Sequence, residues 1–229
     1  MIGQQEEDLS NSEILILLEK GATFGSPHSA LQLGLALIEI ESNSQDGYSD
    51  ESYAWLEKAA EHGLQKALLP MSRLQEAGTA SLPSDGNAAL ETMEKYRATN
   101  PGPEGDYLLA SLILRGRTSR PSSDAVPLLQ TASQLKFYKA TDLLGQCYAT
   151  ATGVEEIEEK KAYKYFIESW NQSKETDSHY YTASNNLGVC FAIGFGTSKD
   201  FENARHYFQQ GSLKNHQASS DNLALLKNG

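Results

Sequence analysis

Six small residues recur along this 229-residue chain, and their spacing constrains the fold more than any other feature. Their separations are 38, 38, 35, 43 and 35 residues. Each of the first five precedes an apolar residue by four positions and a tiny residue by five, as Ala183 precedes Leu187 and Gly188. This stripe predicts one helix per repeat, which we name helix A. The six residues are Ser29, Ala67, Gly105, Ala140, Ala183 and Ala218.

A second amphipathic segment, helix B, follows each helix A after a turn. Glycines eleven residues beyond the small residue, at Gly78, Gly116 and Gly194, predict the end of helix A, because glycine adopts the left-handed conformation at little cost. Helix B carries a small residue and, three and four positions later, a bulky pair on the same face. We expect close backbone approach between the two helices, for example at Gly188 and Ala204. The helix-B sets are Ser52 with Trp55 and Leu56, Ala89 with Thr92 and Met93, Ala125 with Leu128 and Leu129, Ala162 with Tyr165 and Phe166, and Ala204 with Tyr207 and Phe208.

Two segments carry a resemblance to a known family. The run from Trp55 to Gly63 and the phrase Leu187-Gly188-x-x-Phe191-x-x-Gly194-x-Gly196 resemble the Sel1-like (Sel-one-like) repeat family, a branch of the tetratricopeptide superfamily. The 16 residues from Gly188 to Ala204 imply the longer interhelical turn of this branch. The resemblance is strong in repeats one, four and five and weak in two and three. It implies an all-α fold, an α/α superhelical solenoid of about five helix-turn-helix repeats with terminal capping helices.

The repeats organise the chain into one predicted domain. Residues 1–12 are expected to form a tail and residues 13–229 a single solenoid domain, with capping helices near residues 13–22 and 218–226. Ser10 and Glu13 have the spacing of a capping box ahead of the first of these helices. Pro127 is expected in the first turn of its helix, where proline is tolerated. Longer connections that enlarge a partner surface are predicted at Ser42 to Asp50, Thr79 to Asp85, and Asn171 to Tyr180.

Charge and cysteine content exclude several function classes. The formal net charge of −11 opposes long-range attraction to nucleic acid or to an anionic membrane. The apolar run from Ile14 to Leu18 is too short for a secretion signal or a membrane span. We therefore expect a cytoplasmic protein with neither nucleic-acid binding nor membrane insertion. Cys147 and Cys190 lie seven residues after Ala140 and Ala183, which predicts two reduced core thiols rather than a disulfide.

Few residues form a pattern typical of catalysis or metal binding. Ser133-x-x-Lys136 and Ser220-Asp221-Asn222 imitate two penicillin-recognising motifs, but no Lys-Thr-Gly follows and motifs this short arise by chance. The five histidines lack the clustering of zinc ligands. We therefore predict no catalytic residue, no metal and no cofactor. The acidic run from Glu155 to Glu159 is interpreted as a solvated turn, with weak cation binding or a basic partner as the alternative.

The resemblance also implies which residues contact a partner. In the tetratricopeptide superfamily helix A lines the concave face, and peptide ligands are contacted at fixed offsets from the tiny residue of that helix. Asn186 stands where many relatives use asparagine to hold a peptide backbone or a terminal carboxylate. Leu108 and Leu143 replace polar groups that a full carboxylate clamp needs, so a general groove for an extended peptide is favoured. The implied partner-binding residues are Lys66, Arg73, Glu104, Tyr107, Ser111, Lys139, Asp142, Gln146, Asn185 and Asn186.

These expectations favour a non-enzymatic adaptor. It would bind a segment of a partner protein in the concave groove of the solenoid and mediate assembly of a complex. Two other classes stay open. A small-molecule binder or a hydrolase of penicillin-binding type requires polar residues that converge on a closed pocket. A structural self-assembly unit would associate through its end caps, beyond the monomeric or weakly self-associating state expected here.

Overall fold

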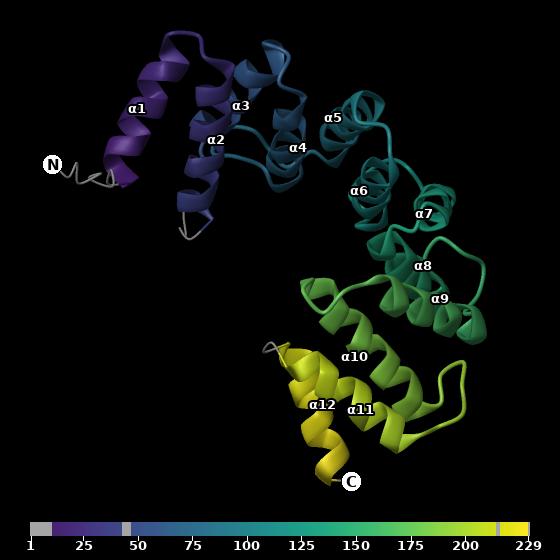
Figure 1. The fold of residues 1–229 in the computed structure, drawn as a ribbon. Coiled ribbons are helices and arrows are strands. Elements are labelled where there is room, and N and C mark those ends of the chain that lie inside the picture. Colours follow the sequence, from purple (N-terminus) through teal and green to yellow (C-terminus); the bar gives the residue numbers. More distant parts are fainter. Residues whose placement is uncertain (1–10, 43–46, 214–215, 229) are drawn as a thin grey trace, which may run out of the picture. The chain divides into compact units, whose positions relative to one another are not determined.

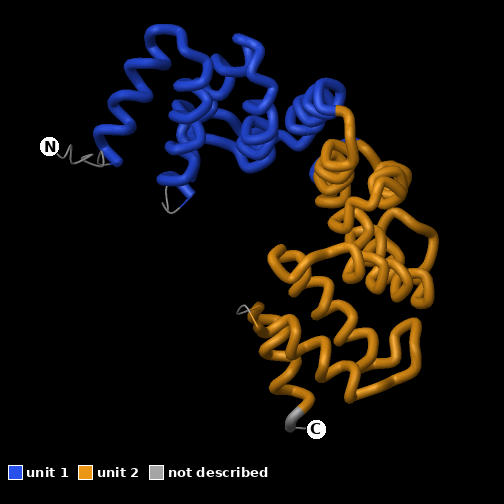
Figure 2. Tube along the Cα trace, viewed as in Figure 1, with its two compact units in different colours: residues 1–100, 117–119 blue, residues 101–116, 120–229 orange. Residues whose placement is uncertain are grey.

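Helices make up all the regular secondary structure in the part of the chain that is described. The computed structural model describes residues 11–42, 47–213 and 216–228, and these ranges contain twelve α-helices, two 3-10 helices and no strand (Figure 1). The predicted all-α fold is confirmed, whereas Ser10 of the predicted capping box lies outside the described residues. The chain divides into two compact units, residues 1–100 with 117–119 and residues 101–116 with 120–229 (Figure 2). The single continuous domain stays a prediction.

Unit 1 contains the first two repeats and the helix that precedes them. The hairpins α2–α3 and α4–α5 are the A and B helices of these repeats, and α1 packs on α2 at the predicted position of a capping helix. The core is mainly aliphatic and includes Leu33, Leu56, Met71 and Leu74. Its helices are α1 (Asn11–Thr23), α2 (Pro27–Glu41), α3 (Asp50–Glu61), α4 (Leu68–Ala77) and α5 (Gly86–Thr99), with the 3-10 helix η1 (Gln65–Ala67) directly before α4.

Unit 2 contains the last three repeats and a final helix. The hairpins α6–α7, α8–α9 and α10–α11 follow one another, and α12 packs on α11 and α10. Aromatic side chains fill much of its core, among them Phe166 and Phe208. Its helices are α6 (Pro103–Leu114), α7 (Ala125–Gln134), α8 (Tyr138–Thr150), α9 (Glu159–Gln172), α10 (Ser178–Ile193), α11 (Phe201–Ser212) and α12 (Gln217–Asn228), with the 3-10 helix η2 (Ser122–Asp124) directly before α7.

Glycines on helix A make room for bulky side chains of helix B. In the first hairpin a Cβ atom at Gly34 would lie 2.8 Å from the Leu56 side chain. In the last hairpin a Cβ atom at Gly188 would lie 2.5 Å from the ring of Phe208. The predicted close approach of the two helices is confirmed. At Gly188, however, the nearest group is the ring of Phe208 of the bulky pair rather than Ala204.

The turns after helix A depend on residues with a left-handed backbone. Gly78, Gly116 and Gly194 all have positive φ, so the predicted ends of these helices are confirmed. Ala151 takes the place of glycine in repeat four with φ of 55°, which costs roughly 1 kcal/mol relative to glycine. Gly196 allows close approach of two backbone segments, because a Cβ atom there would lie 2.2 Å from the carbonyl oxygen of Glu159.

Two expectations about helix edges are corrected. The predicted register of the last helix is wrong by one residue, because Ala218 is exposed and Ser219 is fully buried. Gly211 of α11 leaves the space that the Ser219 side chain occupies, and Ser219 also has the apolar residue at +4 and the tiny residue at +5 that Ala218 lacks. The connection predicted from Asn171 to Tyr180 is also shorter, since α9 ends at Gln172 and α10 begins at Ser178.

Other local expectations are met. Pro127 is the third residue of α7 and so lies in its first turn. Thr79 to Asp85 is irregular, and Ser81 donates its backbone N–H to the Asp50 carboxylate at 3.0 Å, which fastens this connection to the start of α3.

Both cysteines are free and buried in unit 2. Burial raises the pKa of the Cys147 thiol to about 11 and that of the Cys190 thiol to about 12. Neutral thiols in an apolar core match the predicted packing role.

Candidate functional site

The A helices of three successive repeats, α6, α8 and α10, line one hollow within unit 2. Its volume is about 400 Å³. On α8 the lining residues are spaced three and four apart, so helical periodicity alone brings them to one face. We name this feature the polar hollow; its lining includes Tyr107, Ser111, Lys139, Asp142, Gln146 and His179.

A buried carboxylate forms the floor of the polar hollow. Asp142 is 1% exposed, and its two oxygens accept hydrogen bonds from Asn186 Nδ2 at 3.0 Å and Gln146 Nε2 at 2.7 Å. Burial raises the pKa of Asp142, against the opposing effects of His179 and the two amides. Burial also lowers the pKa of His179, against the attraction of Asp142 and Asp177. Desolvation therefore disfavours the charged form of both groups.

A row of rings joins two residues of the lining, Tyr107 and His179. Phe137 and Tyr138 connect them without lining the hollow themselves, and we call the row the ring wall. The ring centroids of Tyr107 and Phe137 are 5.4 Å apart, those of Phe137 and Tyr138 6.1 Å, and those of Tyr138 and His179 5.2 Å. The Tyr138 hydroxyl donates to Asp177, a residue at the N-terminal end of α10. These contacts fix the wall before any ligand arrives.

Five of the ten implied partner-binding residues line this hollow. Asn186 lies next to it and positions Asp142. Asn185 has a different contact, because its side-chain oxygen accepts a hydrogen bond from Asn222 of α12 at 3.0 Å. The five lining residues are Tyr107, Ser111, Lys139, Asp142 and Gln146.

Three implied residues are not brought into the hollow. Glu104 is exposed in the first turn of α6. Lys66 and Arg73 are exposed in unit 1. A role in partner binding for these three residues, and for the other seven, stays a prediction.

Comparisons with known proteins identify the repeat. The family model of the Sel1 repeat matches residues 46–64, 139–170 and 182–216. A protective antigen of uropathogenic Escherichia coli with an SLR fold aligns with a TM-score of 0.69 at 18% identity, and a Sel1 repeat protein of Oxalobacter formigenes with 0.65 at 20%. The chain therefore contains Sel1 repeats. These alignments cover 93% and 95% of this Sel1-repeat chain but 44% and 60% of the two solved chains.

A curated relative shares part of the sequence. Chitin synthase regulatory factor 2 of Schizosaccharomyces pombe is 29% identical over 90 residues, which are 39% of this Sel1-repeat chain and 16% of that protein. The chain thus aligns with less than a fifth of this relative. The family matches fall around helix B of repeat one and in repeats four and five, where the resemblance is strong; repeats two and three still fold as hairpins.

Sequence reasoning misses three polar residues of the hollow in this Sel1-repeat protein: Arg115, His179 and Thr182. Thr182 lies six residues before Gly188, an offset that the repeat register already assigns to the partner face. Arg115 follows Ser111 by one further helical turn, so periodicity could also have found it. His179 lies outside the register, and only tertiary packing against the ring of Tyr138 places it.

The residues beside the polar hollow do not suit nucleophilic catalysis. Ser169 Oγ lies 3.3 Å from His179 Nε2, but the serine is fully buried. Its hydroxyl donates to the carbonyl oxygen of Tyr138 at 2.9 Å. A nucleophile must reach its substrate, and this hydroxyl does not.

The side chains of the Ser133-x-x-Lys136 motif are engaged in contacts within the protein. Ser133 is buried and forms a hydrogen bond with Thr141 at 2.9 Å, while Lys136 Nζ pairs with Glu168 at 3.3 Å. Within the described ranges no cluster of three or more His, Cys, Asp or Glu residues has the arrangement of a metal site. Those ranges also contain no helix with the length and apolar character needed to span a bilayer.

Proposed function

We propose that this Sel1-repeat protein is a non-enzymatic adaptor whose polar hollow holds a segment of a partner protein. The observation that carries the proposal is the convergence of side chains from three successive A helices on one hollow. A surface built from consecutive repeats suits an extended ligand, because each repeat presents the same face at a regular interval. The bound partner would thereby be joined to a larger complex.

The internal contacts of the hollow support this role. Asp142 holds Gln146 and Asn186 in fixed positions through two hydrogen bonds, and the row of rings fixes Tyr107 and His179. A wall that is ordered before binding loses little conformational entropy when a ligand arrives. The arrangement therefore favours recognition.

The wider context agrees with an adaptor. The name of the S. pombe relative describes a regulatory factor, a role exerted on another protein. We extend only the general class of role to this chain. The two free, buried thiols suit a reducing compartment, so the proposal places the protein in the cytoplasm.

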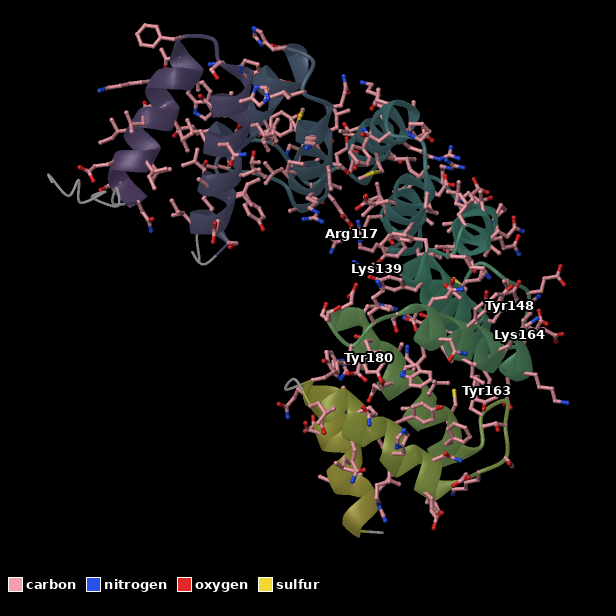
Figure 3. All side chains as sticks on the ribbon, viewed as in Figure 1. Arg117, Lys139, Tyr148, Tyr163, Lys164 and Tyr180 are labelled. Atoms are coloured by element: carbon pink, nitrogen blue, oxygen red, sulfur yellow. The ribbon has the colours of Figure 1, made fainter. Side chains whose placement is uncertain are left out.

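A photocrosslinking phenylalanine derivative at Tyr107 tests the assignment in cells. The substitution keeps an aromatic ring at a half-exposed position of the hollow. Tyr163 of α9 is the matched control, because it is also half-exposed and lies on the opposite side of unit 2 from Lys139 (Figure 3). We expect a defined protein crosslinked from position 107 and not from position 163.

The result is read by mass spectrometry of the crosslinked species. The Ser111→Arg variant, which fills the hollow, is expected to lower the yield from position 107 by about tenfold or more. Equal yields from positions 107 and 163, or no crosslinked protein from position 107, would remove the groove from the proposal.

A further inference from the structure

A second hollow lies further along α8 and α10. Its volume is about 220 Å³, and its lining includes Ala149, Asn186, Val189, Ile193 and Phe195. We name it the apolar hollow. Ile193 is 64% exposed, although it is a large aliphatic residue. An apolar side chain that enters here removes apolar surface from water on both molecules, which favours binding.

One hydrogen-bonded pair connects the two hollows. Asn186 lines the apolar hollow, and its side chain donates to Asp142, which lines the polar hollow. Both hollows also draw on the same two helices, α8 and α10. A single extended segment that follows these helices therefore meets both.

The polar hollow offers positive charge to a ligand. Lys139 is half-exposed, whereas Asp142 is buried and has both oxygens in hydrogen bonds. Lys139 Nζ lies 6.0 Å from the ring centroid of Tyr138, which places the ammonium beside the ring wall. The net charge of −11 acts at longer range, where salt screens it beyond about 8 Å. At contact distance an acidic side chain is favoured.

The helix sets the spacing between the two hollows. Thr182 of the polar hollow and Ile193 of the apolar hollow are eleven residues apart on α10. At about 1.5 Å per residue this is roughly 16 Å along the helix axis. An extended peptide rises about 3.4 Å per residue, so that length corresponds to slightly fewer than five steps. Side chains share a face only when they are an even number of positions apart, and four positions, which span about 14 Å, are the even separation nearest to this length.

We propose that the face of α8 and α10 that lines both hollows recognises two side chains of one extended segment of the partner. We call this pair of side chains the two-part signal. An acidic side chain occupies the polar hollow beside Lys139, and an aliphatic side chain four positions away occupies the apolar hollow beside Ile193. This inference rests on the proposed function and specifies the ligand class of the same groove.

Synthetic peptides test the signal on the full chain. We would measure fluorescence anisotropy with nine-residue peptides whose ends are acetylated and amidated, so that no terminal charge contributes. They carry Glu and Leu four positions apart, in either order, in a Ser and Gly background. We expect replacement of Glu by Gln, or of Leu by Ser, to raise Kd by about tenfold each. A three-residue separation is expected to bind as weakly as either substitution.

Variants of the protein assign each part of the signal to its hollow. In the Lys139→Gln protein, replacing the peptide Glu by Gln is expected to leave Kd unchanged. In the Ile193→Ser protein, replacing the peptide Leu by Ser is expected to leave Kd unchanged. Lys164→Gln is the matched control, since Lys164 is exposed on the opposite side of unit 2 from Lys139 (Figure 3), and it should leave every Kd unchanged.

The outcomes separate this inference from the proposed function. Loss of both peptide effects in the matching variants supports the two-part signal. Equal binding of all peptides, or effects that persist in both variants, overturns the signal, and a partner crosslinked from Tyr107 would then leave the groove itself in place. Failure of the crosslinking as well would overturn both.

Discussion

Units 1 and 2 build the same hairpin with different core side chains. In unit 1 Gly34 on helix A faces Leu56, whereas in unit 2 Gly145 and Gly188 face the rings of Phe166 and Phe208. The aromatic version brings further ring contacts, such as the stacked pair of Phe191 and Tyr207 with centroids 5.6 Å apart. The backbone arrangement of the hairpin therefore does not require aromatic residues; it requires a helix-A face small enough for the side chain of helix B.

The polar hollow lies in the aromatic unit. Its wall begins with Tyr107 and ends with His179, and the rings between them span α6, α8 and α10. Aromatic rings supply a large, rigid contact area with only two rotatable side-chain bonds, which suits a preorganised surface. The rings of this row are half-exposed, so the binding face of unit 2 has its own aromatic residues beside the buried rings of Phe166 and Phe208.

The largest expected difference in stability comes from truncating the buried helix-B side chain that faces the helix-A glycine, which we call the anchor. Phe208→Ala should destabilise unit 2 by about 3–5 kcal/mol and Leu56→Ala unit 1 by about 2–5 kcal/mol, because both side chains are almost fully buried. The two tryptophans report on the units separately: Trp55 lies in unit 1 and Trp170 in unit 2. Urea unfolding followed by fluorescence in Trp55→Phe and Trp170→Phe backgrounds measures each transition.

Each truncation is the control for the other. Phe208→Ala is expected to shift the transition seen by Trp170, whose ring contacts Tyr207 of α11 at 5.4 Å. A shift of equal size in the Trp55 signal would contradict the independence of the two cores.

A smaller effect follows from the glycines that face these anchors. Gly188→Ala should destabilise unit 2 by about 1–3 kcal/mol, because its Cβ atom would lie 2.5 Å from the Phe208 ring. Gly34→Ala should cost less, since its closest contacts, at 2.8 Å and 2.9 Å, are with Cγ and Cδ2 of the flexible Leu56 side chain, and the backbone oxygen of Ser52 at 3.1 Å needs to shift by only a few tenths of an ångström. The same unfolding measurement checks both. Equal costs would show that ring rigidity does not distinguish the units.

The hairpins were predictable from the sequence because their cause is local. Five stripes of small and apolar residues each gave a helix A, and all five apolar members, from Leu33 to Leu187, are buried. The error at Ala218 could have been avoided with the same stripe, because Ser219 is followed by the apolar Leu223 four positions later and the tiny Ala224 five positions later. Five of the ten implied site residues meet in one hollow because they share this register.

The other features depend on tertiary contacts that no spacing encodes. His179 joins the hollow through the ring of Tyr138, and Asn185 is engaged by α12. The apolar hollow needs Phe195, a residue beyond the end of α10, to lie near Ala149 of α8. These placements require the packed structure.

Substitutions of the turn residue that follows helix B are expected to change the free energy of unfolding by about 1 kcal/mol, in opposite directions in the two units. Gly63 in unit 1 and Lys136 in unit 2 both follow the buried anchor by seven residues, and their φ angles are 86° and 64°. Gly63→Ala should destabilise unit 1 by about 1 kcal/mol, with no steric contribution because a Cβ atom there meets open space. Lys136→Gly should stabilise unit 2 by up to about 1 kcal/mol, because it relieves the left-handed strain.

Lys136→Ala separates strain from charge in the same turn. It keeps the strained backbone but removes the pair with Glu168, an exposed contact worth roughly 0–1 kcal/mol. If Lys136→Gly and Lys136→Ala change stability equally in the unfolding measurement, the backbone argument is wrong.

The smallest expected contrast is a pH dependence confined to unit 2. Burial lowers the pKa of His179 below its ordinary value of 6.5, so the unfolded chain binds a proton before the folded chain does. The free energy of unfolding of unit 2 should therefore decrease as pH falls below 6.5, and should not depend on this group at higher pH. Burial raises the pKa of Asp142, which has the opposite sign: its contribution decreases as pH rises above 3.8.

The His179→Gln variant isolates the histidine. Lys139, Asp142 and Asp177 act on the charge of His179 in the wild type, and all three remain in the variant. Urea unfolding followed by Trp170 at pH 7.5, 6.5 and 5.5 should show a smaller loss of stability on acidification in the variant than in the wild type. The Trp55 transition of unit 1 should respond to acid equally in both proteins. If the Trp170 transitions of wild type and variant keep the same pH dependence, burial does not lower the pKa of His179, and the polar hollow then presents an additional cation to its ligand only below about pH 6.5.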